Sequence, residues 1–347
     1  ILIIMNITVI GGGTGSTVVL QGLKKYQDLN LRVIVGMMDD GGSNAAVRDE
    51  FGLLPLSDVR KSILALADTS NNEVWRKLFV YRFSEGNGIK GHTLGNLLMV
   101  AMTDILGSEL EAIEMFKNLF SVRGEVLPVT FDDVRLVAEY DDGSKVIGEH
   151  YIDEPKKHKN IVNFYLDSEA KAFDETLQAI DSSDYLVLGP GDLFTTILPN
   201  ILVSGVKERI QQSKAKIVYV ANLMSKIGQT RGRTHKESVE LLEKYMGRDI
   251  DIVVVNKGNI PTKAYKRYLE DGENVMEDDL CDGFGRTVIR TDLVATDVIR
   301  KDKGDSLDRS LVRHDTEKLA KTLYQVFYSK KNSVLRMVGN LLAHYKD

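Results

Sequence analysis

Two glycine-rich stretches contain the residue types best suited to binding chemistry. The first comprises Gly11, Gly12, Gly13, Thr14, Gly15 and Ser16, and it separates an apolar run from a segment with helical spacing. Glycines let an anion approach the backbone closely, and the free amides at the start of the following helix point at that anion. The hydroxyl groups add further donors. This stretch predicts a phosphate-binding loop; the alternative is a tight turn that binds no ligand.

The first stretch departs from the two common nucleotide motifs. No lysine follows its last glycine, as a P-loop requires, and Ser16 stands where the dinucleotide fingerprint expects glycine or alanine. A second stretch repeats the combination of glycines and hydroxyl groups after the apolar residues 185–188; it comprises Gly189, Pro190, Gly191, Asp192, Thr195 and Thr196. Two such loops on one edge of a sheet can hold the two ends of a nucleotide diphosphate.

Acidic residues follow another apolar run. Asp39 and Asp40 precede Gly41-Gly42-Ser43, at a position where doubly wound folds meet a ribose hydroxyl or a metal ion. The same residues could form an ordinary solvated turn. Asp58 begins a helical segment and could be only an N-terminal helix acid. We assign no metal site: Asp39, Asp40 and Asp58 are weak candidates for one, and Ser43 joins the candidates for ligand binding.

Four more polar residues lie where a ligand could reach them. His92 and Asn96 are four apart in an expected helix and share one face, either in a pocket or as a cap and a satisfied core group. Asn222 follows the apolar run 217–220 and either reads a base or sugar or caps a turn. Arg313 either grips a phosphate or lies on the surface. The catalytic residues, if there are any, stay unassigned.

The spacing of apolar residues predicts the elements that must position these side chains. Strands are expected at 6–10, 31–37, 185–188, 217–220 and 252–255, and helices at 57–66, 74–83, 92–106, 109–119 and 315–328. Short apolar strands that alternate with helices predict an α/β fold, here a Rossmann-like, doubly wound and mostly parallel sheet.

The same pattern predicts how the chain is divided. Alternating runs at 134–140 and 145–150 flank an Asp-Gly turn, which indicates a small inserted β-hairpin region at about 126–166. We expect a single domain over residues 5–328 and a helical extension at 329–347.

Composition excludes several classes of protein. The 45 basic residues against 50 acidic ones give a net charge of −5, which argues against a dedicated nucleic-acid binder. A single cysteine, Cys281, excludes a disulfide framework and a multi-cysteine zinc site, and it indicates a reducing, cytoplasmic setting. The apolar first ten residues are too short to cross a bilayer and lack the features of a signal peptide, so we expect no membrane span.

Taken together, these motifs resemble a known superfamily over roughly residues 5–328. It contains the 2-phospho-L-lactate transferases (the CofD-like proteins) and the YvcK-type bacterial gluconeogenesis factors. Besides the two glycine stretches, the resemblance rests on Asp39-Asp40-Gly41-Gly42-Ser43, Leu54-Pro55-Leu56-Ser57-Asp58-Val59-Arg60, His92-Thr93-Leu94-Gly95-Asn96, Asn222-Leu223-Met224 and Val312-Arg313-His314-Asp315.

Two departures distinguish the branches. Transferases of the superfamily look like Pro-Asp-x-Asp where this chain has Ser57-Asp58-Val59-Arg60, so Arg60 replaces a carboxylate that would help to hold magnesium. Their second loop tends to read Gly-Pro-Ser-Asn-Pro, whereas here Leu193 follows Asp192. The gluconeogenesis-factor branch fits better.

The resemblance implies a non-catalytic regulator that binds UDP-sugars such as UDP-N-acetylglucosamine and that connects gluconeogenic carbon with envelope synthesis and cell shape. No cofactor is then required, while a homo-oligomer and a regulatory protein partner are possible. The alternative is a magnesium-dependent transferase of the 2-phospho-L-lactate transferase type, with a nucleotide diphosphate donor. A dehydrogenase is disfavoured because no general acid with a fixed neighbour is visible for hydride chemistry.

Overall fold

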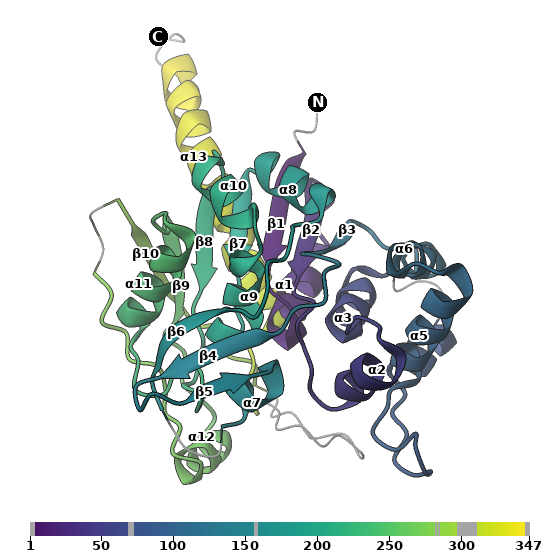
Figure 1. Ribbon diagram of the computed structural model, residues 1–347. Coiled ribbons are helices and arrows are strands. Elements are labelled where there is room, and N and C mark those ends of the chain that lie inside the picture. Colours follow the sequence, from purple (N-terminus) through teal and green to yellow (C-terminus); the bar gives the residue numbers. More distant parts are fainter. Residues whose placement is uncertain are drawn as a thin grey trace.

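A seven-stranded parallel sheet forms the centre of the protein (Figure 1). The computed structural model describes residues 4–68, 73–155, 159–281, 283, 285–296 and 311–343. The strand order is β10-β9-β8-β7-β1-β2-β3. The strands are β1 (Met5–Ile10), β2 (Leu29–Val35), β3 (Glu125–Pro128), β7 (Tyr185–Leu188), β8 (Lys216–Val220), β9 (Ile252–Asn256) and β10 (Thr287–Thr291). The expected Rossmann-like α/β fold is confirmed.

The position of β1 creates a switch point in the strand order of the sheet. From β1 the chain runs through α1 (Gly13–Leu23) to β2 on one side, whereas β7 pairs with β1 on the other side and leads on to β8. The strand order therefore reverses between β1 and β7. At such a switch point, the loops after neighbouring strands separate and leave a crevice at the carboxyl edge of the sheet.

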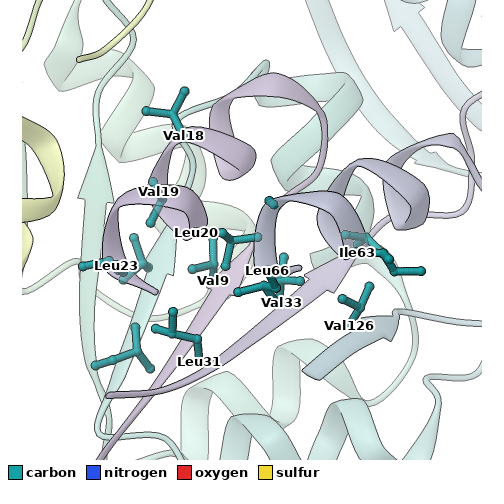
Figure 2. Close-up of a cluster of buried hydrophobic side chains, with 14 of the residues drawn as sticks. Val9, Val18, Val19, Leu20, Leu23, Leu31, Val33, Ile63, Leu66 and Val126 are labelled. Carbon is teal, nitrogen blue, oxygen red and sulfur yellow. The ribbon is translucent and has the colours of Figure 1, made fainter. Parts of the chain in front are cut away.

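Helices cover both faces of the sheet, so its strands are apolar on both sides. Along β7, Leu186 and Leu188 belong to one buried cluster, while Tyr185 and Val187 belong to the other. Figure 2 shows part of the cluster that includes Tyr185 and Val187, where α1 and α3 pack on β1, β2 and β3. The helices of this face are α1, α3 (Ser57–Leu66) and α13 (Thr316–Ala343); the opposite face carries α8 (Asp174–Asp181), α9 (Leu198–Leu202), α10 (Val206–Gln212) and α11 (His235–Met246).

Two of the connections between strands of this sheet contain long insertions. The connection from β2 to β3 contains α3 and four further helices, α2 (Ser43–Phe51), α4 (Glu73–Val80), α5 (Leu94–Leu106) and α6 (Glu109–Leu119). The insertion after β3 forms a separate antiparallel sheet, β5-β4-β6, with β4 (Leu136–Tyr140), β5 (Lys145–Ile147), α7 (Glu149–Asp153) and β6 (Ile161–Leu166). Figure 1 shows this small sheet beside the lower part of the main sheet.

Most of the expected elements are present, and the differences have local causes. The expected hairpin is part of a three-stranded sheet. The third strand, β6, was not predicted, because its run carries no turn signal of its own. The strands β3, β6 and β10 and the short helix α2 escaped detection. The helix expected from His92 begins at Leu94, because Thr93 is its N-cap and accepts a hydrogen bond from the amide of Asn96.

The C-terminal helix also continues further than the main domain. Asp315 caps α13 by accepting hydrogen bonds from the amides of Glu317 and Lys318. The backbone of α13 is helical from Thr316 to Ala343, while residues 344–347 lie outside the described part. Within the described residues, no helix combines the length and hydropathy needed to cross a membrane.

A close contact between α1 and α13 gives a stability prediction. A methyl group on Gly22 would lie 2.6 Å from the carbonyl oxygen of Thr316 and 2.5 Å from the Cβ atom of Ala320. Gly22→Ala should therefore lower the free energy of unfolding by about 1–3 kcal/mol, although alanine is the better helix former. Urea unfolding measures the change, with Gln21→Ala as the control on the same helix. An equal or higher stability of Gly22→Ala would contradict this packing.

Candidate functional site

The two glycine stretches lie against each other at the carboxyl edge of the sheet, beside β1. The first follows β1 and opens α1, and the second follows β7. A methyl group on Gly15 would overlap the carbonyl oxygen of Pro190, and one on Gly11 would lie 3.7 Å from the Cγ2 atom of Thr196. Only a glycine at position 15 allows this approach. The expected gathering of the two loops on one edge of the sheet is therefore what the structure has.

The N-terminus of α1 is already in contact with a carboxylate. The amide of Gly13 donates a hydrogen bond of 2.7 Å to Oδ2 of Asp58, and Nζ of Lys61 lies 2.6 Å from Oδ1. A negative charge is favoured there by the unsatisfied amides of the first turn and the helix dipole. Asp58 is thus a helix acid, as the simpler alternative stated, but it serves α1 from the first turn of α3.

Ser43, His92 and Asn96 come together as a group. The hydroxyl of Ser43 lies 2.8 Å from Nδ1 of His92 and accepts a hydrogen bond of 3.3 Å from Nδ2 of Asn96. Oδ1 of Asn96 accepts a hydrogen bond of 2.7 Å from Nε of Arg60. Ser43 thus joins the loop after β2 to the start of α5, and Asn96 is buried within this network.

Arg60 stands where the transferases have a metal-binding carboxylate, but its side chain packs into the protein. Its side chain is buried, with Nε bonded to Asn96 and Nη1 donating 3.0 Å to the carbonyl of Phe79. Because the guanidinium is held among α3, α4 and α5, we derive no anion binding from it.

Asp39 and Asp40 fix the loop after β2. The carboxylate of Asp39 accepts hydrogen bonds from the amide of Gly41 (2.9 Å) and the hydroxyl of Ser57 (3.3 Å). Burial raises the pKa of Asp39, and the charge of Asp58 raises it further. Asp40 accepts a hydrogen bond of 2.8 Å from the amide of His150, which joins this loop to the inserted sheet.

The insertion contributes two carboxylates that the sequence analysis missed. Glu149 and Asp153 stand at the two ends of α7, which packs on the π-helical turn η1 (Leu193–Ile197) after the second glycine stretch. Burial raises the pKa of Glu149 well above its usual range, and the charges of Asp39, Asp153 and Asp40 add to this effect. No spacing in the sequence relates α7 to the glycine stretches.

Lys226 offsets the charge of two of the acidic residues, Asp153 and Asp192. Its Nζ atom lies 2.6 Å from Oδ1 of Asp153 and 2.9 Å from Oδ2 of Asp192. Burial alone would lower the pKa of Lys226, but the two carboxylates raise it overall. Gln229 extends the network by donating from Nε2 to Asp153 (2.9 Å) and to the hydroxyl of Thr195 (3.0 Å). The position of Lys226 in the loop after β8, two residues beyond Met224, was the signal that could have found it.

Asn222 is occupied in joining two loops. It accepts a hydrogen bond of 3.2 Å from the amide of Gly191 and donates one of 3.0 Å to the carbonyl of the same residue. Of its two expected roles, the turn-fixing one matches these contacts.

Arg313 lies in a segment that packs beside this loop. Its neighbour His314 is buried near the backbone of Ala221, and burial lowers the pKa of the imidazole to about 4. Arg313 itself is half-buried, and its carbonyl accepts a hydrogen bond of 3.0 Å from the amide of Ala295. The tail motif therefore reaches the same edge of the sheet as the glycine loops, because Ala221 directly follows β8.

Comparison with known proteins assigns the chain to a family. Residues 7–294 match the family model described as 2-phospho-L-lactate transferase CofD. The chain belongs to the CofD family. A putative gluconeogenesis factor of Thermotoga maritima is 38% identical over 93% of this chain and 99% of the relative. The gluconeogenesis factor of Bacillus subtilis is 35% identical over 92% of this chain and 96% of the relative.

A solved relative has the same architecture. The crystal structure of a UPF0052-family protein from Bacillus halodurans superposes with a TM-score of 0.82 at 34% identity, covering 92% of this chain and 98% of the other. The expected resemblance to the gluconeogenesis factors and CofD-like proteins is confirmed by these matches.

We predict that the Lys226 network contributes more to the stability of the protein than a surface ion pair does. The Lys226 side chain is 27% exposed, so Lys226→Met should cost about 3 kcal/mol of stability, near the lower end for a buried pair that loses one partner. Asp153 and Asp192 would then lack their cation. The deficit should shrink as the pH falls, since protonated carboxyls need no counterion. Urea unfolding at several pH values measures both effects.

The matched control is Lys236→Met on α11. Lys236 pairs with Glu240 at 3.9 Å, with both side chains more than half exposed, so its removal should change stability by less than about 1 kcal/mol. Equal losses in the two variants would show that the Lys226 network contributes no more than a surface pair.

Proposed function

We propose that this CofD-family chain is a regulator that binds a nucleotide sugar, with UDP-N-acetylglucosamine or a similar UDP-sugar as its ligand. The observation that carries the proposal is the contact of the two glycine loops at the β1–β7 switch point, sealed by Gly15 against Pro190. A crevice there, with helix amides on one side and hydroxyl groups on the other, suits a diphosphate. The names of the gluconeogenesis-factor relatives support a link to gluconeogenic carbon.

The distribution of charge suggests how the ligand is oriented. Asp58 occupies only one of the free amides of the first turn of α1, so the phosphates face the remaining ones. Asp39 and Asp40 accept hydrogen bonds, and hydroxyl groups of a ribose or sugar are suitable donors for them. The raised pKa values of Asp39 and Glu149 favour their neutral forms and so reduce the repulsion of an anionic ligand. Arg313 is proposed to pair with a phosphate.

The carboxylates do not fit a preformed magnesium site. Asp39 and Asp58 each have both carboxylate oxygens in contacts with donors of the protein. Across the described residues, no three histidine, cysteine or acidic side chains are grouped so that they could hold a metal ion. We propose that the regulator binds its ligand without a required cofactor, and the engaged oxygens of Asp39 and Asp58 support this.

The alternative function is that of the family's namesake. The match to the 2-phospho-L-lactate transferase model favours a magnesium-dependent phospho-group transferase with a nucleotide diphosphate donor. Against it stand the buried Arg60, which replaces a carboxylate of the transferase motif, and Leu193 in the second loop. We propose a cytoplasmic setting for the regulator, in which its signal for envelope synthesis and cell shape passes to a protein partner.

Gly13 provides the first test of the proposal. Its φ of +64° lies in the left-handed region, and a Cβ atom there would point into open space. We expect Gly13→Val to abolish UDP-N-acetylglucosamine binding in calorimetry, because the new side chain fills the space before the loop and the backbone must also leave its conformation. Gly107→Val is the matched control, since Gly107 has a φ of +71° and equally open surroundings at the end of α5. Normal affinity in Gly13→Val would mean that the loop is only a turn.

The second test separates the regulator from the enzyme. We expect UDP-N-acetylglucosamine to bind equally well with magnesium and with a chelator, and to stay intact during hours of incubation with the protein. Calorimetry checks the first result and chromatography of the incubated ligand checks the second. Magnesium-dependent release of UMP or UDP, above the level with heat-killed protein, would establish the transferase alternative.

A further inference from the structure

A groove of about 350 Å³ lies away from the crevice, between the inserted sheet and the helices α9, α10 and α11. Its apolar lining includes Val162 of β6 and Ile201 and Leu202 of α9. Tyr245 of α11 also faces it. Val162 is 60% exposed, which is unusual for a valine in a strand beside a packed helical layer. The volume is in the range of sites that hold a few side chains of a ligand.

Two lysines give this groove a charge that the protein leaves without a counterion. Lys207 of α10 and Lys244 of α11 line it, and neither has an acidic partner in the part of the chain that the structure describes. Glu208 also lines the groove and accepts a hydrogen bond of 3.1 Å from the amide of Gly205, so two lysines stand against one acid in this lining. The groove is therefore complementary to carboxylates.

One wall of the groove is the outer edge of a β-sheet. Strand β6 pairs with β4 on one side and ends the order β5-β4-β6 on the other. The carbonyl of Phe164 points away from β4, because it accepts a hydrogen bond of 3.3 Å from the hydroxyl of Tyr245 across the groove. An edge strand of this kind can accept an extended segment as a further strand.

A second groove lacks these features. It has a volume of about 400 Å³ and is lined by residues at the starts of β7–β10 and by α13. Its lysine, Lys216, is paired with Asp251. The two lysines and the exposed part of the β6 edge, at Val162 and Asn163, occur together in the β6 groove.

We propose that the β6 groove is the docking site for an acidic, extended peptide segment of a partner protein. Carboxylates of the segment pair with Lys207 and Lys244, its apolar side chains cover Val162 and Leu202, and its backbone lies along the exposed part of β6 at Val162 and Asn163. This proposal is independent of the ligand in the crevice, since none of the groove residues belongs to the glycine loops.

The test uses a fluorescein-labelled octapeptide of alternating glutamate and valine, and measures fluorescence anisotropy with the full chain. We expect binding to weaken by at least about tenfold in the double variant Lys207→Glu, Lys244→Glu, because both charge-assisted contacts become repulsive. The control Lys214→Glu, Lys236→Glu carries the same change of charge on exposed lysines outside the groove and should bind as the unaltered protein does. Circular dichroism checks that all variants are folded.

Three further results decide between occupants. Peptide binding should slow the hydrogen exchange of the β6 amides, whereas a matching peptide of lysine and valine should not bind. If the glutamate peptide fails to bind, or binds both double variants equally, the proposal is overturned. If free glutamate displaces the peptide at equal concentration, the groove is a site for small anions and the peptide proposal fails.

Discussion

The close approach of Gly15 to Pro190 is the contact on which the candidate site depends. Two loops from neighbouring strands can meet this closely only if one of them lacks a side chain, because a methyl group on Gly15 would overlap the Pro190 carbonyl. The contact lies at the point where the strand order reverses, between β1 and β7. It places the N-terminus of α1 against the second glycine loop. The loop after β8 contacts that glycine loop through Asn222, and the segment before α13 packs beside the loop after β8.

Electrostatic balance is the second constraint. The edge of the sheet gathers acids from four separate segments: Asp39 and Asp40 after β2, Asp58 on α3, Glu149 and Asp153 on α7, and Asp192 after β7. Lys61 and Lys226 offset part of this charge, and the raised pKa values of Asp39 and Glu149 offset more of it. In the proposed binding mode, backbone amides face the anion, whereas the carboxylates suit hydroxyl groups. We propose that this arrangement separates the phosphate part of the ligand from its sugar part.

The insertion has two distinct roles in this architecture. Through α7 it places Glu149 and Asp153 over the crevice, and it is tied there by the amide of His150 to Asp40 and by Asp153 to Lys226. Through β6 it presents a sheet edge to the helices α9 and α11 on another side. Because α9 continues directly from η1, one short helical segment lies between the second glycine loop and the β6 groove.

The sequence by itself determined the parallel α/β fold, the two glycine loops and their common edge, because apolar periodicity and glycine placement are local signals. Family membership also followed from the order of the motifs. Tertiary structure decided which polar groups are already engaged: Asn222 with Gly191, Arg60 with Asn96, and Asp58 with Gly13. It also brought in Glu149, Asp153 and Lys226. The bonded partners lie 31 to 73 residues apart, and no local pattern encodes hydrogen bonds between segments that meet only when the sheet and its insertion pack together.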